Sequence, residues 1–276
     1  MSPYGERLRA VTDRRGPLCV GVDPHPALLD AWGLPATAAG LERFARGTVA
    51  ALGATVAVIK PQSAFFEAYG SAGVAVLERT LADIADAGAL SLLDVKRGDI
   101  GSTMDAYAAA YLGDGSALAA DAITLSPFLG FGSLGGAIDV AAAAGRGVYV
   151  LAATSNPEGA EVQSARTPAG PTVTQTLVTR AAARNAGQDL GPVGLVVGAT
   201  RPVDADLAGL HGSILVPGLG AQGGRPEDLP AIFGPALRWV LPTTSREVLR
   251  AGPAPAALRG AAERVLGQVR RALTVG

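Results

Sequence analysis

The sequence predicts an α/β protein, a (β/α)8 TIM barrel formed by a single domain over residues 1–276 with an extra N-terminal helix. Three observations predict this fold. Eight short apolar runs of β type alternate with Ala-rich helical stretches along the chain. The runs are apolar almost throughout, which is typical of parallel strands buried on both faces. The length of 276 residues slightly exceeds the ~250 residues that a closed barrel of this kind needs.

Each predicted unit is a short run, a turn and a helical stretch. The expected strands are 18–23, 56–61, 90–96, 122–127, 147–154, 193–199, 213–218 and 237–242. The expected helices are 38–53, 72–88, 102–112, 133–144, 172–187, 203–209, 226–233 and 255–273. Segment 3–15 precedes the first strand, and we expect it to form a helix that closes the bottom of the barrel. A doubly wound open sheet is the alternative, but eight regular units without a charged linker favour closure.

Composition excludes several classes of function. The formal net charge is −1 and the cationic residues are spread along the chain, which argues against a nucleic-acid or acidic-membrane partner. No apolar run approaches the roughly 18 residues that cross a bilayer, and the N-terminus has no signal-peptide pattern. Cys19 is the single cysteine, so we expect no internal disulfide and a reducing cytoplasm. Because His25 and His211 lie far apart and no Cys/His cluster exists, we expect no metal site.

Polar residues gather at the carboxyl ends of the expected strands, the face on which barrel enzymes build their active sites. These residues are Asp23, Lys60, Asp94, Lys96, Ser126, Thr154, Ser155, Pro217 and Arg246. Any one of them could be a helix cap or a loop residue. So many residues of complementary chemistry at one rim predict a functional site.

The most informative stretch is DVKRGD, which ends the third expected strand. Because side chains alternate along a strand, Asp94 and Lys96 point the same way, and Gly98 permits a turn before Asp99. Lys60 ends another apolar run, so the sequence predicts a charge array of two lysines and two aspartates. A substrate anion beside Asp94 or Asp99 would be destabilised, its loss as CO2 would relieve the repulsion, and Lys96 could protonate the remaining carbanion. The alternative is a set of structural ion pairs.

A glycine-rich segment, PGLGAQGG at 217–224, follows the seventh expected strand. Glycines let backbone N–H groups approach an anion, and the helix expected from Pro226 offers its positive end. Arg246 follows the eighth strand, so the two together match the usual phosphate site of a barrel. Gln222 could reach a carbonyl or a phosphate. The alternatives are an ordinary βα turn and a surface arginine.

Two further rim segments carry candidate binding groups. TSNP at 154–157 ends the fifth strand and opens a Gly/Pro-rich segment to about residue 171, which suggests a lid or binding loop. Ser155 could hydrogen-bond a planar heterocycle, although Ser/Thr/Asn before Pro is also ordinary turn chemistry. Asp23 could cap a helix or accept hydrogen bonds from ribose hydroxyls.

Together these motifs closely resemble the orotidine 5′-monophosphate decarboxylase family. The signature Asp-x-Lys-x-x-Asp followed by Ile-Gly-x-Thr stands at Asp94 to Thr103, and it is highly specific. The longer forms resemble the bacterial branch with the longer chain: KPQSAFFEAYG at 60–70, TSNP at 154–157, VGAT at 197–200 and PGLGAQGG at 217–224. The motifs cover seven of the eight expected strand ends, so the resemblance spans essentially the whole chain.

The resemblance implies decarboxylation of orotidine 5′-phosphate to UMP and CO2 without cofactor or metal, the last step of pyrimidine synthesis. It implies that Lys96 donates a proton to C6, that Asp94 opposes the substrate carboxylate, and that Lys60 bridges the array and the ribose. Asp99 and Thr103 would enter the site of the partner subunit, which implies a homodimer with shared active sites. The remaining implied substrate contacts are Asp23 on the ribose, Ser155 on the pyrimidine, Gln222 and Arg246 on the phosphate and closed lid, and Pro217, Gly223 and Gly224 in the loop.

Two other functions remain open from the sequence. One is a metal-dependent sugar-phosphate decarboxylase or epimerase of the same barrel superfamily. Such a site needs a further acid on the first or second strand, where this chain has Lys60. The other is a non-catalytic barrel that senses a nucleotide, which would keep the phosphate loop but has no need of two lysines and two aspartates.

Overall fold

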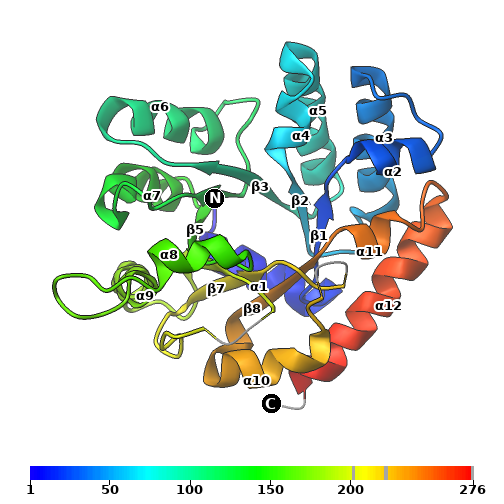
Figure 1. The fold of residues 1–276 in the computed structure, drawn as a ribbon. Coiled ribbons are helices and arrows are strands. Elements are labelled where there is room, and N and C mark those ends of the chain that lie inside the picture. The colour runs from blue at the N-terminus through cyan, green and yellow to red at the C-terminus, as the bar shows by residue number, and fades with distance from the viewer. Residues whose placement is uncertain (201–202, 221–222, 275–276) are drawn as a thin grey trace.

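Eight parallel strands close into a barrel in chain order, with β1 paired to β8 (Figure 1). The structure is a computed structural model that describes residues 1–200, 203–220 and 223–274. The strands are β1 (Cys19–Val22), β2 (Val58–Pro61), β3 (Leu90–Arg97), β4 (Ala122–Leu125), β5 (Gly147–Ala153), β6 (Gly191–Val197), β7 (Gly212–Val216) and β8 (Val240–Thr244). The predicted (β/α)8 barrel is confirmed, and every strand overlaps its expected range.

Helices surround the barrel on its outer side (Figure 1). The α-helices are α1 (Tyr4–Arg15), α2 (Pro26–Ala31), α3 (Ala38–Leu52), α4 (Ser63–Glu67), α5 (Gly70–Asp86), α6 (Gly101–Leu112), α7 (Gly135–Ala143), α8 (Ala160–Gln163), α9 (Val173–Arg184), α10 (Leu229–Phe233), α11 (Arg246–Leu249) and α12 (Pro255–Thr274). The 3₁₀-helices are η1 (Phe131–Leu134), η2 (Pro157–Gly159), η3 (Pro226–Asp228) and η4 (Gly234–Trp239). None of the helices among the described residues is long and apolar enough to cross a membrane.

One expected helix is wrong. Residues 203–209 form turns and bends between β6 and β7. The Asp206 side chain accepts a hydrogen bond from the backbone of Ala208, and its own N–H donates to Gln175 of α9. Such side-chain bonds offer the backbone an alternative to the helix. Leu207 and Leu210 are nevertheless buried, so the segment covers the barrel without helical structure.

The core has two layers separated by the sheet. Inside the barrel lie alternate residues of the strands, such as Val58, Leu92 and Tyr149. Their neighbours along the strands, such as Ile59 and Leu93, belong to the larger outer core beneath the helices. Alternation of this kind means that every inward position near the carboxyl end of a strand opens onto the top of the barrel.

Helix α1 closes the bottom of the barrel, as the sequence predicts. Its Tyr4, Leu8 and Val11 pack into the inner core, and the Tyr4 hydroxyl lies 3.0 Å from that of Tyr149 on β5. Gly5 faces the carbonyl of Leu190 so closely that a Cβ at this position would overlap the oxygen. The bottom is therefore sealed by packing, and the opposite end remains for a site.

We predict that Gly5→Ala destabilises the protein by about 1–3 kcal/mol, because the added methyl group overlaps backbone that has no room to move. The matched control is Gly47→Ala in α3, where a Cβ meets nothing within 4 Å. That substitution should stabilise the protein by about 0.5–1 kcal/mol. Urea unfolding of both variants measures the effect, and equal stabilities would contradict the packing of α1.

Candidate active site

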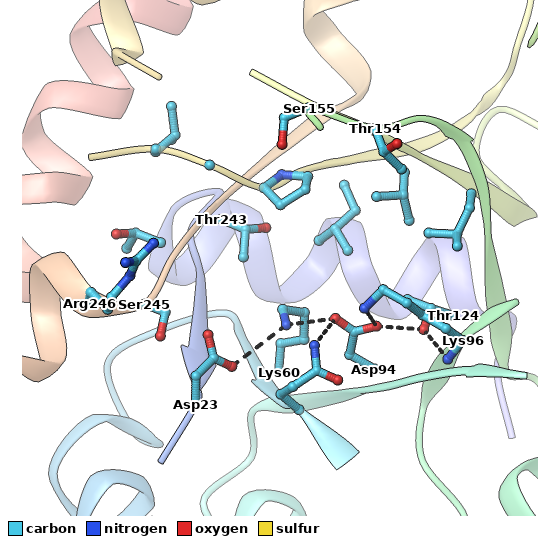
Figure 2. A pocket seen from close by; sticks show the side chains of 18 of the residues that line it. Asp23, Lys60, Asp94, Lys96, Thr124, Thr154, Ser155, Thr243, Ser245 and Arg246 are labelled. Atoms are coloured by element: carbon cyan, nitrogen blue, oxygen red, sulfur yellow. Dashed lines mark hydrogen bonds and ion pairs between the residues drawn. The ribbon is translucent and has the colours of Figure 1, made fainter. Parts of the chain in front are cut away.

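A cavity of about 330 Å³ opens at the carboxyl ends of the strands. Eight of the residues that the sequence predicts at this rim line it: Asp23, Lys60, Asp94, Lys96, Thr154, Ser155, Pro217 and Arg246. They come from positions spread over more than two hundred residues of sequence, and Figure 2 shows most of them facing one space. Ser126, which the sequence placed on the same rim, is not among the lining residues.

The centre of the site is the carboxylate of Asp94, which lies between two ammonium groups. Lys60 Nζ lies 3.0 Å from Oδ2, and Lys96 Nζ lies 2.6 Å from Oδ1. Lys60 is also 4.0 Å from a carboxylate oxygen of Asp23. Figure 2 shows Asp23, Lys60, Asp94 and Lys96 as one row of alternating charges. Asp94 and Lys96 do point the same way, as their spacing in the strand predicts.

Burial separates the roles of the two lysines. The Lys60 side chain is 7% exposed, whereas that of Lys96 is 45% exposed and faces the open cavity. These two residues are also the only lysines in the sequence, and the other cationic side chains are arginines and histidines. The compact ammonium group of a lysine side chain is therefore present only in the charge array.

The pKa values of the buried pair are shifted so that both groups stay charged. Burial by itself would raise the pKa of Asp94, but the charges of Lys60 and Lys96 outweigh it and the pKa lies below its usual value. Burial would likewise lower the pKa of Lys60, yet the charges of Asp94 and Asp23 raise it above its usual value. Asp94 and Lys60 are therefore both ionised at neutral pH although both are buried.

Lys96 reaches the cavity from an unusual backbone conformation. Its φ is +45°, in the left-handed region that non-glycine residues rarely adopt. The β3–β4 register shifts between Leu93 and Arg97, and the Lys96 N–H donates to the hydroxyl of Thr124 at 2.9 Å. Backbone strain of this type costs free energy and persists where the surrounding structure holds a functional side chain.

Several lining residues were not predicted from the sequence. Gln62 and Thr124 both donate to the Asp94 carboxylate, and Ser245 precedes Arg246 at the start of α11. Reading inward positions at a period of two would have found Gln62 two residues after Lys60, and Thr124 two residues before Ser126. The cavity is also lined by His25 and by Asn156, Gly218 and Leu219, which lie within the TSNP and PGLGAQGG segments. The remaining lining residues, which the sequence did not single out, are Leu151, Val196, Leu215, Thr243 and Thr244.

Three buried side-chain atoms that line the cavity have no hydrogen-bond partner within the described ranges: Asp23 Oδ1, Thr244 Oγ1 and Ser245 Oγ. Asp23 Oδ1 has only the ion pair with Lys60 Nζ at 4.0 Å. Buried polar atoms are normally satisfied, so each unsatisfied one needs an explanation. A polar ligand in the cavity would supply the missing hydrogen bonds.

The glycine-rich loop is only partly in the cavity. Pro217, Gly218 and Leu219 line it. Gly223 and Gly224 do not, and their N–H groups donate to carbonyls of the loop itself, at 2.8 and 3.0 Å. Gln222 lies outside the described residues. The phosphate contacts of Gln222, Gly223 and Gly224 therefore stay predictions.

The segment 156–171 folds back onto the end of β5. It contains η2 and α8, and the Gln163 side chain accepts from the Thr154 N–H at 3.0 Å and donates to the Thr154 hydroxyl at 2.7 Å. The strand end that carries Ser155 is thus fixed by α8. We did not predict this helix, because its four residues are too short to show a helical period.

Asp99 and Thr103 do not line the cavity of their own chain. Asp99 accepts a hydrogen bond from the Ile100 N–H at 2.8 Å, and Thr103 is exposed on α6. One protomer therefore brings together three of the four predicted charged groups. The predicted entry of Asp99 and Thr103 into a partner's site stays a prediction.

Fold and site together define a class of protein: a barrel enzyme whose site consists of charged side chains, with an ionised acid and an exposed lysine in an open cavity. Within the described residues, no group of three or more His, Cys, Asp and Glu side chains could hold a metal ion. The ionised Asp94 and the exposed Lys96 can destabilise an anion electrostatically and transfer a proton from an ammonium group.

Comparison with known proteins identifies the family to which the chain belongs. Residues 16–260 match the model of the orotidine 5′-phosphate decarboxylase / HUMPS family. Orotidine 5′-phosphate decarboxylase of Salinispora tropica is 59% identical over 276 residues, covering 99% of both chains. That of Streptomyces coelicolor is 54% identical over 279 residues, again covering 99% of both. A crystal structure from Streptomyces avermitilis, described as a candidate orotidine 5′-phosphate decarboxylase, superposes with a TM-score of 0.96 at 55% identity, covering 99% of this chain and 97% of that one. This chain belongs to the orotidine 5′-phosphate decarboxylase / HUMPS family.

We predict that Asp94→Asn lowers the free energy of unfolding by about 3–5 kcal/mol at pH 7, because it leaves the buried Lys60 charge without its closest partner. Without Asp94, the pKa of Lys60 should fall below its unfolded value of about 10.4. The folded variant then binds fewer protons than the unfolded chain, so its stability should rise with pH and the deficit should shrink between about pH 7 and 10.

The control for this substitution is Asp83→Asn, which removes an acid from a solvent-exposed pair with Arg46 at 2.6 Å. It should cost at most about 1 kcal/mol. Chemical denaturation at several pH values measures both variants. A deficit for Asp94→Asn that stays constant with pH would contradict the assignment of Lys60 as its buried partner.

Proposed function

We propose that this chain decarboxylates orotidine 5′-phosphate to UMP and CO2, the last step of de novo pyrimidine biosynthesis, without metal or cofactor. The observation that carries the proposal is the ionised Asp94 held between Lys60 and Lys96 at the floor of an open cavity. Relatives at 54–59% identity that bear the name of this enzyme support it.

The reaction follows from the charges. A substrate carboxylate bound beside Asp94 meets a second negative charge in a site of low dielectric, which raises the free energy of the bound substrate. The bond between C6 and the carboxyl carbon breaks, CO2 leaves, and the electron pair remains on C6. The Lys96 ammonium group stabilises this carbanion and transfers a proton to it. A proton from solvent then restores Lys96, so one proton is consumed for each CO2 released.

The other lining groups hold the remote parts of the substrate. In this proposal Asp23 and Lys60 hold the ribose, and the absence of a hydrogen-bond partner for Asp23 Oδ1 among the described residues supports that role. Ser155 holds the pyrimidine. Arg246, together with Gln222 and the 217–224 loop, holds the phosphate. Binding free energy from these contacts would be used to keep the carboxylate against Asp94.

A second copy of the chain would complete the site. The exposed apolar side chains Ile100, Phe128 and Leu129 are 63%, 77% and 51% exposed, and they follow the ends of β3 and β4. These ends are adjacent, because the Ser126 N–H donates to the Arg97 carbonyl at 2.8 Å. A group of exposed apolar side chains is typical of a protein–protein interface. We therefore propose a homodimer in which Asp99 and Thr103 of each protomer enter the partner's cavity.

The alternative functions are less well supported. The family description also includes HUMPS members, but a divalent cation at the floor of this cavity would face Lys60 and Lys96. A nucleotide sensor does not explain the buried ion pairs.

We further propose that the 276 residues act as one domain. We also propose that the enzyme works in the cytoplasm, a location that the single, buried Cys19 supports.

We predict that the purified protein consumes orotidine 5′-phosphate, followed by its absorbance, at a rate that EDTA does not change. Lys96→Ala should abolish turnover while UMP binding, measured by calorimetry, changes by less than about 3-fold, because the lysine acts on the carbanion and not on the product. Arg43→Ala, an exposed helical residue, serves as the matched cationic control.

Three results would contradict the proposal. Chelator-sensitive activity on a sugar phosphate would favour the metal-dependent enzyme. Absent turnover with tight UMP binding by the wild type would favour a sensor. Substantial residual activity of Lys96→Ala would remove this lysine from its role.

We also predict that two inactive variants complement each other. In a mixture of Lys96→Ala and Asp99→Ala, a hybrid dimer has one site with both residues intact, so about a quarter of wild-type activity should return after subunit exchange. Activity that stays at the level of the separate variants would show that Asp99 acts within its own chain or not at all.

A further inference from the structure

The carboxylate of Asp94 is held by a balanced set of donors. Among the described residues, four side-chain donors reach it: Lys96 Nζ at 2.6 Å and Thr124 Oγ1 at 2.8 Å on Oδ1, and Lys60 Nζ at 3.0 Å and Gln62 Nε2 at 2.9 Å on Oδ2. Each oxygen therefore has one charged and one neutral donor. An ionised carboxylate can accept about four such bonds, so its capacity is filled.

The two neutral donors are fixed by the strands on either side of β3. Gln62 follows β2 and forms a backbone bridge with Asp94 itself, which sets its amide beside the carboxylate. Thr124 lies on β4 with its side chain 1% exposed. Neither group can lose or gain a charge when a ligand binds.

Thr124 has a second contact that links it to the proton donor. Its hydroxyl donates to Asp94 and accepts from the backbone N–H of Lys96 at 2.9 Å. This N–H belongs to the residue with φ of +45°, outside the regular β3–β4 ladder. One hydroxyl thus fixes both the acid and the strained backbone from which the lysine extends.

Proton transfer requires Lys96 to leave its shortest contact. In the proposed reaction its ammonium group must turn from Asp94 to C6 of the substrate. A buried carboxylate that loses a donor becomes more basic and holds the departing proton more strongly. Donors that remain in place would lower that penalty, because hydrogen bonds to an ionised group stabilise the charged form.

We propose that Thr124 and Gln62 are positioning residues that share the negative charge of Asp94, so that Lys96 can release this carboxylate and protonate the substrate. The inference rests on the proposed decarboxylation. It adds two neutral residues to the charge array and explains why a carboxylate flanked by two lysines also needs two uncharged donors.

The other charged and titratable groups around Asp94 stay unchanged in the test. Lys60 from β2 faces it directly, and Asp23 beyond β1 faces Lys60. Arg246 at the start of α11 and His25 line the same cavity, and the Cys19 thiol is buried in the inner core of the barrel. Burial raises the pKa of the Cys19 thiol to about 12, and the variants leave this residue unchanged. A change seen on removing a hydroxyl or an amide is therefore a change in hydrogen bonding alone.

The experiment uses the presence of only two lysines in the chain. Protein carrying isotope-labelled lysine gives one side-chain NMR signal for each, assigned with Lys96→Arg. The titration of Lys96 is followed without ligand in the wild type, Thr124→Val, Thr124→Ser and Gln62→Leu. Steady-state kinetics with orotidine 5′-phosphate and calorimetry with UMP are measured on the same proteins. Thr80→Val is the control, because its buried hydroxyl donates to Val76 within α5, away from the cavity.

We expect Thr124→Val and Gln62→Leu to raise the pKa of Lys96 and to lower kcat by about 10- to 100-fold, with UMP affinity changed by less than about 3-fold. Thr124→Ser keeps the hydroxyl and should retain activity within about 3-fold of the wild type. Thr80→Val should change neither kcat nor the titration of Lys96.

Unchanged titration of Lys96 in both Thr124→Val and Gln62→Leu would overturn the inference, as would a loss of UMP affinity with kcat unchanged. Failure of the proposed function is a separate result. A wild type that does not consume orotidine 5′-phosphate contradicts the decarboxylation, whereas the ligand-free titrations still decide whether the two neutral donors share the charge of Asp94.

Discussion

The rest of the site depends on one constraint, a carboxylate kept ionised inside the barrel. Removing Asp94 from water costs several kcal/mol unless donors converge on it. Here they come from three neighbouring strands: Lys60 from β2, Lys96 from β3 and Thr124 from β4. None of these strands alone could hold the charge. The closed parallel sheet brings their ends together, and the floor of the cavity exists only because the barrel closes.

The residues at the rim of the cavity form two groups around this carboxylate. The first group, Asp23, Ser155 and Arg246, lines the cavity and is suited to bind the parts of a substrate that are remote from the reacting carbon. In the second group, Lys96 extends from strained backbone, and the chain then continues through Asp99 to the exposed Ile100. Asp99, the fourth member of the predicted array, does not line the cavity of its own protomer, and exposed apolar side chains lie beside it. Both observations support the proposed homodimer.

Much of this could be predicted from the sequence. Strand positions followed from apolar runs of six to eight residues, and the charge array followed from the spacing of Asp94 and Lys96 beside a strand end. The failures have physical causes. Residues 203–209 were expected to be helical, but Asp206 bonds the backbone instead. The short helices α2, α4, α8 and α11 gave no periodic signal, because one or two turns do not establish a period.

The sequence by itself determined the alternation that makes a barrel and the presence of two acids and two lysines at strand ends. Local chemistry carries that information, since side chains alternate along a strand whatever its neighbours are. Only the tertiary structure decided that Gln62 and Thr124 meet Asp94, that Lys60 is buried while Lys96 is exposed, and that Asp99 lies outside its own cavity. Those facts depend on the register between strands and on the path of the chain beyond them, which residues distant in sequence fix jointly.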